Sequence, residues 1–181
     1  MSTDEHLTPP PPRENLFIAA DVISNLQENH WLIGDPTTEQ TVWASRAASL
    51  LGVFAENPAQ LGDLLRLVFH YNAAEILELP DSHAVLARHD AREVIRQLAT
   101  LLLDPVPLTS ERFKEIIGKL RDTSSIRSRD LFHPVRLALA GCAGEGHLDR
   151  VLLLLDEAAT LNFAVPVKSA RTRILEFCAS L

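Results

Sequence analysis

A glycine-rich elbow and one arginine are the residues of this chain with the clearest chemical potential. They lie in the stretch LFHPVRLALAGCAGEGHL at 131–148, where an apolar run carrying Arg136 ends in GCAGEG and a second apolar run follows. Such an elbow could hold a phosphate or contribute to a metal site. It could also bend the chain between two helices and present the arginine to a partner.

The elbow departs from the pattern of a phosphate-binding loop. Such a loop follows a strand and closes with Gly-Lys-Ser/Thr. Here a helical pattern comes first, and Glu145 and His147 stand where the lysine and the hydroxyl residue should be. A carboxylate at that position repels phosphate. Gly141 is typical of a helix C-cap in the left-handed conformation, so we expect a bend between two helices.

The other polar residues do not form a metal or catalytic pattern. Cys142 and His147 are five positions apart, and His83 and His89 are six apart, without further ligands at zinc spacing. The sequence contains no G-x-S-x-G, and no carboxylate pair stands out from the surface charge. We therefore expect a non-catalytic protein without a metal or other cofactor.

Arg136 has two possible roles that spacing alone does not distinguish. We expect a helix beginning near His133-Pro134, with Val135 and Leu139 on its buried face and Arg136 off that face. A lone arginine commonly forms a structural ion pair. Its planar fork of donors also suits a nucleobase edge or a phosphate.

The charge of the chain is unevenly distributed. The formal net charge is −7, which argues against a nucleic-acid partner. However, residues 1–109 contain 6 Lys and Arg against 15 Asp and Glu, whereas residues 110–181 contain 11 against 9. Any anionic ligand is therefore expected on the second part, unless the asymmetry is ordinary scatter among solvated surfaces.

Composition indicates a globular protein in the cytoplasm. Apolar residues make up 46% of the chain, and two cysteines are too few for a disulfide framework, which favours a reducing compartment. The N-terminus is polar and proline-rich, unlike a signal peptide. The longest apolar runs, such as VLLLL at 151–155, are too short to cross a bilayer, so no membrane association is expected.

The hydrophobic pattern predicts an all-α fold of two packed helical subdomains. Residues 1–13 form a proline-rich tail that is expected to be flexible. The two prolines of Asp104–Pro107 separate a first subdomain, 14–104, from a second, 108–181. Helix starts are expected after Thr37, with Gln40 completing a capping box, after Asn57 and at Thr109 or Ser110. One long helical region is expected after Asp81 or Ser82.

The stretch SIRSRDLFHPVRLALAG resembles a segment near the C-terminus of bacterial-type glutamyl-tRNA synthetases. That segment has a polar loop and then Leu-Phe-x-Pro-Leu/Ile-Arg-x-Ala-Leu-Thr-Gly. The helix SERFKEIIGKLRD and the upstream NPAQLGDLLRLVFHYN are similar to the helices that precede it. The residues that match the signature are Leu131, Phe132, Pro134, Arg136, Ala138, Leu139 and Gly141.

This resemblance covers the two all-helical domains that bind the anticodon arm, without the nucleotide-binding fold, the H-x-G-H and the lysine-rich loop of the catalytic domain. It implies a non-catalytic tRNA-binding protein, with tRNA for glutamate as the expected tRNA. Arg136 is then the principal reader, and the loop with Cys142, Glu145 and Leu148 lies against a splayed base. The residues expected to make supporting phosphate contacts are Arg127, Arg129, Lys119 and Arg150.

A protein-interaction module that has kept the fold and lost RNA binding is the alternative. The chain departs from the family pattern at two places, since it has Ala140-Gly141 where the family has Thr-Gly, so that alanine stands for threonine, and Glu145-Gly146 where the family has Gly-Pro. The carboxylate of Glu145 adds a like charge against phosphate. The partner of such a module could be a synthetase acting in trans.

Overall fold

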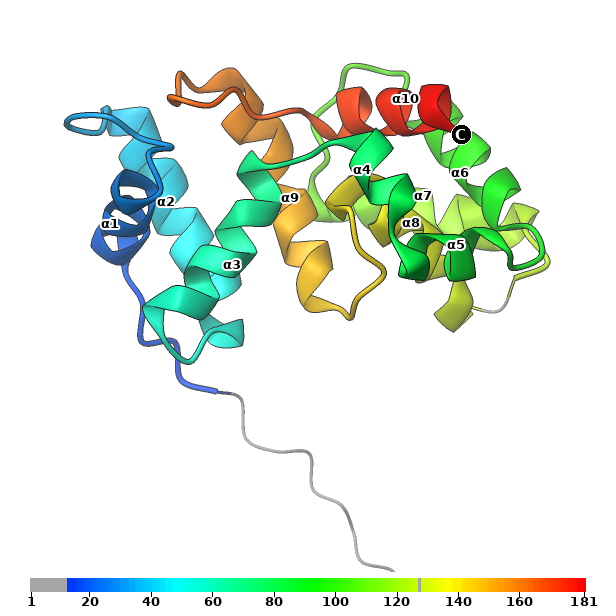
Figure 1. Ribbon diagram of the computed structural model, residues 1–181, viewed down its shortest axis with the longest axis horizontal. Helices are drawn as coiled ribbons and strands as arrows, with labels where there is room; N and C mark the ends of the chain where they lie inside the picture. The colour runs from blue at the N-terminus through cyan, green and yellow to red at the C-terminus, as the bar shows by residue number, and fades with distance from the viewer. Residues whose placement is uncertain (1–12, 127) are drawn as a thin grey trace, which may run out of the picture.

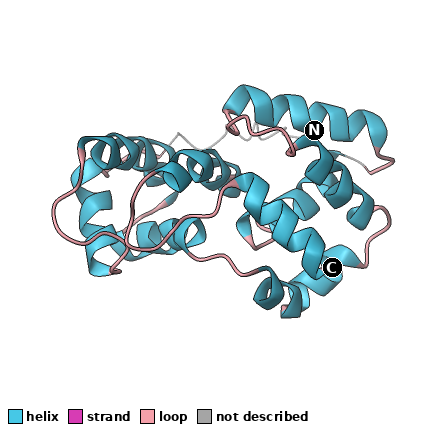
Figure 2. Ribbon diagram, turned by 90° about the horizontal axis from the view of Figure 1, so that it is seen from above, coloured by secondary structure: helices cyan, strands magenta, loops and turns pink. Residues whose placement is uncertain are grey.

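The computed structural model describes residues 13–126 and 128–181, and within this part every regular element is helical (Figures 1 and 2). The predicted all-α fold is confirmed. The predicted tail lies outside the described residues apart from Arg13, and so does Arg127. The helices are α1 (Ala19–Glu28), α2 (Thr38–Leu51), the 3-10 turn η1 (Gly52–Phe54), α3 (Pro58–Phe69), α4 (Ala73–Glu78), α5 (Pro80–Leu86), α6 (Ala91–Leu101), α7 (Ser110–Thr123), α8 (Ser128–Ala140), α9 (His147–Thr160) and α10 (Ala170–Ser180). None of these helices has the length and apolar character needed to span a membrane.

Local capping signals correctly located several helix ends. The Thr37 hydroxyl accepts the Gln40 amide N–H at 3.2 Å, and the Gln40 side chain accepts the Thr37 amide at 2.9 Å, which completes the capping box of α2. The side chains of Asn57 and Thr109 cap α3 and α7 by accepting the amides of Gln60 and Arg112, without the reciprocal bond of a capping box. Gly141 has a φ of +84°, which confirms the left-handed residue at the end of α8.

Two predicted helix boundaries are wrong. Helix α8 begins at Ser128, so Pro134 lies inside the helix rather than at its start. The extra turn buries Leu131 completely beside Val135, and this packing offsets the hydrogen bond that proline removes. The long region expected after Asp81 is two helices, α5 and α6, because the chain turns at Asp90 with a φ of +64°.

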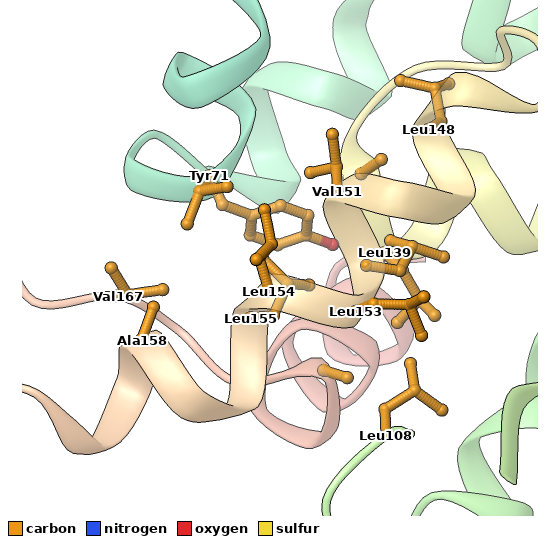
Figure 3. Packing of buried hydrophobic residues seen from close by; sticks show 14 of the residues in the cluster. Tyr71, Leu108, Leu139, Leu148, Val151, Leu153, Leu154, Leu155, Ala158 and Val167 are labelled. Carbon is orange, nitrogen blue, oxygen red and sulfur yellow. The ribbon is translucent and has the colours of Figure 1, made fainter. Parts of the chain in front are cut away.

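Helix α9 lies at the centre of the molecule. It packs against α2 and α3 on one side and against α8 and α10 on the other (Figure 1). The run 151–155 is buried throughout, so apolar side chains cover nearly the whole circumference of the helix. Figure 3 shows Val151, Leu154 and Leu155 along α9, with Tyr71 and Leu139 nearby. The predicted division at Asp104–Pro107 falls in the loop between α6 and α7 and stays a prediction.

The carboxylate of Asp156 ties the starts of two helices to α9. It accepts the backbone N–H of Leu108 at 2.6 Å, just before α7, and that of Ala170 at 2.8 Å, the first residue of α10. A negative charge at helix N-termini is favourable because the helix dipole is positive there. This arrangement fixes the beginning of α7 relative to α9.

Arg173 is a fully buried arginine that joins the ends of two helices. Its guanidinium donates to the carbonyls of Leu67 at 2.9 Å and Val68 at 2.6 Å, in the last turn of α3. It also donates to Leu139 at 2.9 Å, near the end of α8, and to Lys168 at 3.1 Å, before α10. Helix C-termini carry partial negative charge, so these carbonyls both satisfy and stabilise the cation.

The ring of Tyr71 completes the surroundings of this arginine. The Cζ atom of Arg173 lies 4.7 Å from the ring centroid, and the Tyr71 hydroxyl donates to the carbonyl of Ala138. Burial raises the pKa of Tyr71, so its hydroxyl stays a donor at neutral pH. Burial also lowers the pKa of Arg173 to about 10, which still leaves the guanidinium charged near pH 7.

Replacing Arg173 with leucine should destabilise the fold by about 3 kcal/mol, because it leaves buried carbonyls of α3 and α8 without a donor. Urea unfolding followed by circular dichroism measures the change. The control is Arg171→Ala, an exposed position on the same helix, which should change stability by less than about 0.5 kcal/mol. Equal effects of the two substitutions would contradict the role of Arg173.

Candidate nucleic-acid interface

Arg136 closes the elbow through a two-pronged ion pair. Its Nε donates to one carboxylate oxygen of Asp149 at 2.8 Å and its Nη2 to the other at 3.0 Å, while Nη1 donates to the carbonyl of Gly144 at 3.0 Å. The side chains of Arg136 and Asp149 are 11% and 24% exposed. The guanidinium of Arg136, which was expected to contact RNA, therefore donates its hydrogen bonds within the protein. This is the structural ion pair that the sequence had left open as its other role.

The elbow between α8 and α9 is a compact turn that depends on glycine. A Cβ atom at Gly144 would lie 2.7 Å from the side chain of Leu148, and one at Gly141 would lie 3.0 Å from Ile76. The Leu148 amide donates to the Glu145 carbonyl at 3.0 Å, which satisfies one of the first amides of α9 within the turn. The elbow therefore bends the chain between helices, as its residue types indicated.

The other predicted residues of the elbow differ in their access to a ligand. The side chain of Leu148 is 1% exposed and belongs to the core, so an RNA contact at this position falls to its backbone, and its place in an RNA-binding loop stays a prediction. Cys142 is half-buried, and burial raises the pKa of its thiol, which disfavours the reactive thiolate. Glu145 is exposed, so its negative charge faces solvent.

The two predicted phosphate contacts whose side chains the structure describes, Lys119 and Arg150, line different hollows. Lys119 pairs with Glu115 at 2.7 Å and lines a hollow with residues of α6. Arg150 is exposed near the start of α9 and lines a different hollow. Arg127 lies outside the described residues, as does the side chain of Arg129.

Among the described residues, a groove between α7 and α9 brings together three cations that could meet an anionic ligand. It has a volume of about 470 Å³, and Lys114 and Arg121 of α7 and Arg150 of α9 contribute cations to it. We call it the α7–α9 groove. The remaining lining residues are Ser110, Phe113, Ile117, Gly118, Phe132, Gly146, Asp149 and Leu153. A groove with basic and aromatic side chains can hold both the phosphates and the base faces of a single strand.

Phe132 connects this groove to the Arg136 ion pair. The guanidinium carbon of Arg136 lies 4.7 Å from the centroid of the Phe132 ring, a cation–π contact. Asp149 lines the groove but is paired with Arg136, so its charge is neutralised there. The groove consequently has three cations and no uncompensated carboxylate among its described lining residues.

Sequence reasoning missed Lys114, Arg121 and Phe132 as site residues. The spacing of positions 114, 118 and 121 is i, i+4, i+7, which places Lys114, Gly118 and Arg121 on one face of α7. Gly118 lies in the helix interior, where glycine is unfavourable, and a Cβ atom there would meet nothing within 4 Å. A glycine inside a predicted helix, with a cation on the same face on either side of it, was the sequence feature that could have indicated this groove.

A double-mutant cycle of Arg136→Ala and Asp149→Asn should give a coupling free energy of about 1–3 kcal/mol, because the pair is largely buried and two-pronged. Chemical denaturation of the four proteins measures it. Additive effects would mean that the ion pair does not hold the elbow closed.

Gly118→Ala should stabilise the protein by about 0.5–1 kcal/mol, since alanine restricts the unfolded chain and finds free space in the folded one. Thermal or urea unfolding measures the gain. A loss of stability would show that a side chain at position 118 does not fit the folded protein, so that packing requires glycine there.

Comparison with known proteins gives two partial similarities. The chain is 24% identical over 136 residues to the glutamate–tRNA ligase of Exiguobacterium sibiricum, covering 75% of this chain and 28% of that protein. It is 26% identical over 118 residues to glutamate–tRNA ligase 2 of Syntrophus aciditrophicus, covering 65% of this chain and 24% of that protein. The matches thus span about a quarter of each relative. No family model and no solved structure matches the chain. The similarities support an origin related to glutamate–tRNA ligases.

Proposed function

We propose that this chain binds tRNA without catalysing a reaction, acts in the cytoplasm, and corresponds to the anticodon-binding region of a glutamate–tRNA ligase. The observation that carries the proposal is the similarity to two such ligases, which extends over as much as 75% of the chain. The signature around Arg136 lies in the half of the chain that has the more basic composition. On this proposal, tRNA for glutamate is the preferred ligand.

The structure makes a direct contact by Arg136 costly. To reach RNA, its guanidinium would have to leave both oxygens of Asp149 and the carbonyl of Gly144. Leaving Asp149 partly buried without its partner carries a penalty of several kcal/mol. Arg136 fits better as the residue that holds the elbow and Phe132 in place for other residues to contact RNA.

The second candidate is a protein-interaction module, with a synthetase acting in trans as a possible partner. The exposed carboxylate of Glu145 on the elbow and the net charge of −7 favour it, because both disfavour phosphate. Salt dependence separates the two candidates. RNA binding releases counterions and weakens steeply with salt, whereas a largely apolar protein complex responds little.

Titration of the purified protein with total tRNA and with tRNA for glutamate should give saturable binding. If three phosphates are contacted, affinity should fall roughly 20-fold between 50 and 200 mM salt, following a slope of about −0.7 per contact. Filter binding or fluorescence anisotropy measures both affinities. Absence of binding at low salt, where phosphate contacts are strongest, would reject the proposed function.

A further inference from the structure

We infer that the α7–α9 groove holds a single-stranded segment of RNA, with phosphates at Lys114, Arg121 and Arg150 and a base against the Phe132 floor. The inference rests on the proposed function and specifies the part of the molecule that carries it out. It assigns the direct contacts to residues around the groove, and gives Arg136 a positioning role behind Phe132.

The charge of the groove is opposite to that of the molecule as a whole. Lys114, Arg121 and Arg150 are exposed, and within the described part of the chain none of them pairs with a carboxylate. The chain as a whole has a net charge of −7. A locally positive groove on an acidic protein directs an anionic ligand to one place.

The spacing of the cations suits a polymer better than a single anion. Lys114 and Arg121 are seven residues apart on one face of α7, which is about 10.5 Å along a helix axis. Arg150 approaches from α9, across the groove. Cations separated in this way can contact different phosphates of one strand, while a free phosphate ion would reach them only in part.

The floor of the groove favours an unpaired strand over a duplex. Phe113, Ile117, Phe132 and Leu153 give it apolar and aromatic surface. Bases in a duplex are stacked on one another, so only an unstacked base can cover such a floor. The Arg136 guanidinium, 4.7 Å from the centroid of the Phe132 ring and fixed by Asp149, holds that ring in position.

Gly118 is the independent observation that points to a ligand. It lies between Lys114 and Arg121 on the wall of the groove, and no neighbouring atom lies within 4 Å of where its Cβ would be. No packing contact or positive φ therefore requires glycine inside this helix. Glycine at this position keeps the space between the two cations open.

The sharpest test fills this space without removing a charge. Gly118→Leu places a good helix former in the groove, so the protein should remain folded and have at least wild-type thermal stability. Its affinity for tRNA and for a seven-nucleotide unpaired RNA should fall at least tenfold. Ser45→Leu, the matched control, adds the same side chain at an exposed position of α2 outside the groove and should keep its affinity within twofold of the wild type. Fluorescence anisotropy at low salt measures all three proteins.

Charge removal tests the phosphate contacts. The double variant Lys114→Gln, Arg121→Gln should lower the salt slope of RNA binding by about 1.4, which corresponds to two contacts on a single strand. Arg66→Gln, Arg92→Gln removes the same charge from exposed positions outside the groove and should leave the slope unchanged. Equal changes in the two double variants would overturn the inference.

The outcomes separate this inference from the proposed function. If wild type binds tRNA and Gly118→Leu binds it equally well, the groove assignment is wrong and tRNA binding stands. If wild type binds the short unpaired RNA through the groove but not tRNA, the groove assignment stands without the proposed function. If the wild-type protein binds neither tRNA nor the short RNA, both the groove assignment and the proposed function are wrong. Displacement of RNA by polyglutamate at equal charge concentration would overturn the choice of RNA as the occupant.

Discussion

The positive charge of Arg173 is buried where the ends of α3 and α8 and the segment before α10 converge. Four backbone carbonyls accept its hydrogen bonds, and the Tyr71 ring lies against it. A buried cation is tolerated only when its donors are satisfied, so these segments must keep their relative positions. Because α3 belongs to the acidic half and α8 to the more basic half, this interaction links the parts of the chain that the charge pattern distinguishes.

The proposed RNA interface depends on the end of α8 that Arg173 fixes. Gly141 ends that helix, the elbow follows, and the Arg136–Asp149 pair connects α8 to the first turn of α9. The Asp156 carboxylate of α9 then holds the start of α7 in place. The two helices that form the walls of the α7–α9 groove are therefore fixed relative to each other. The arginine expected to read RNA thus becomes part of the scaffold.

Features determined by neighbouring residues could be predicted from the sequence. The Thr37 capping box and the left-handed Gly141 follow from local geometry, and the helical periodicity gave the fold class. Features determined by tertiary packing could not. Pro134 is inside a helix because Leu131 must be buried, and nothing near Arg173 in the sequence indicates that distant carbonyls surround it. The groove also escaped prediction, since its walls come from helices that only the fold brings together.

The central claim is that a single strand of RNA occupies the α7–α9 groove. Amide chemical-shift mapping during titration with a short unpaired RNA tests it most directly, because glycine amides resonate in a distinct region of the spectrum. The account predicts the largest shifts at Gly118, Gly146 and Arg150, with little change in α1 and α2. Shifts confined to α1–α3, or none at saturating RNA, would contradict it.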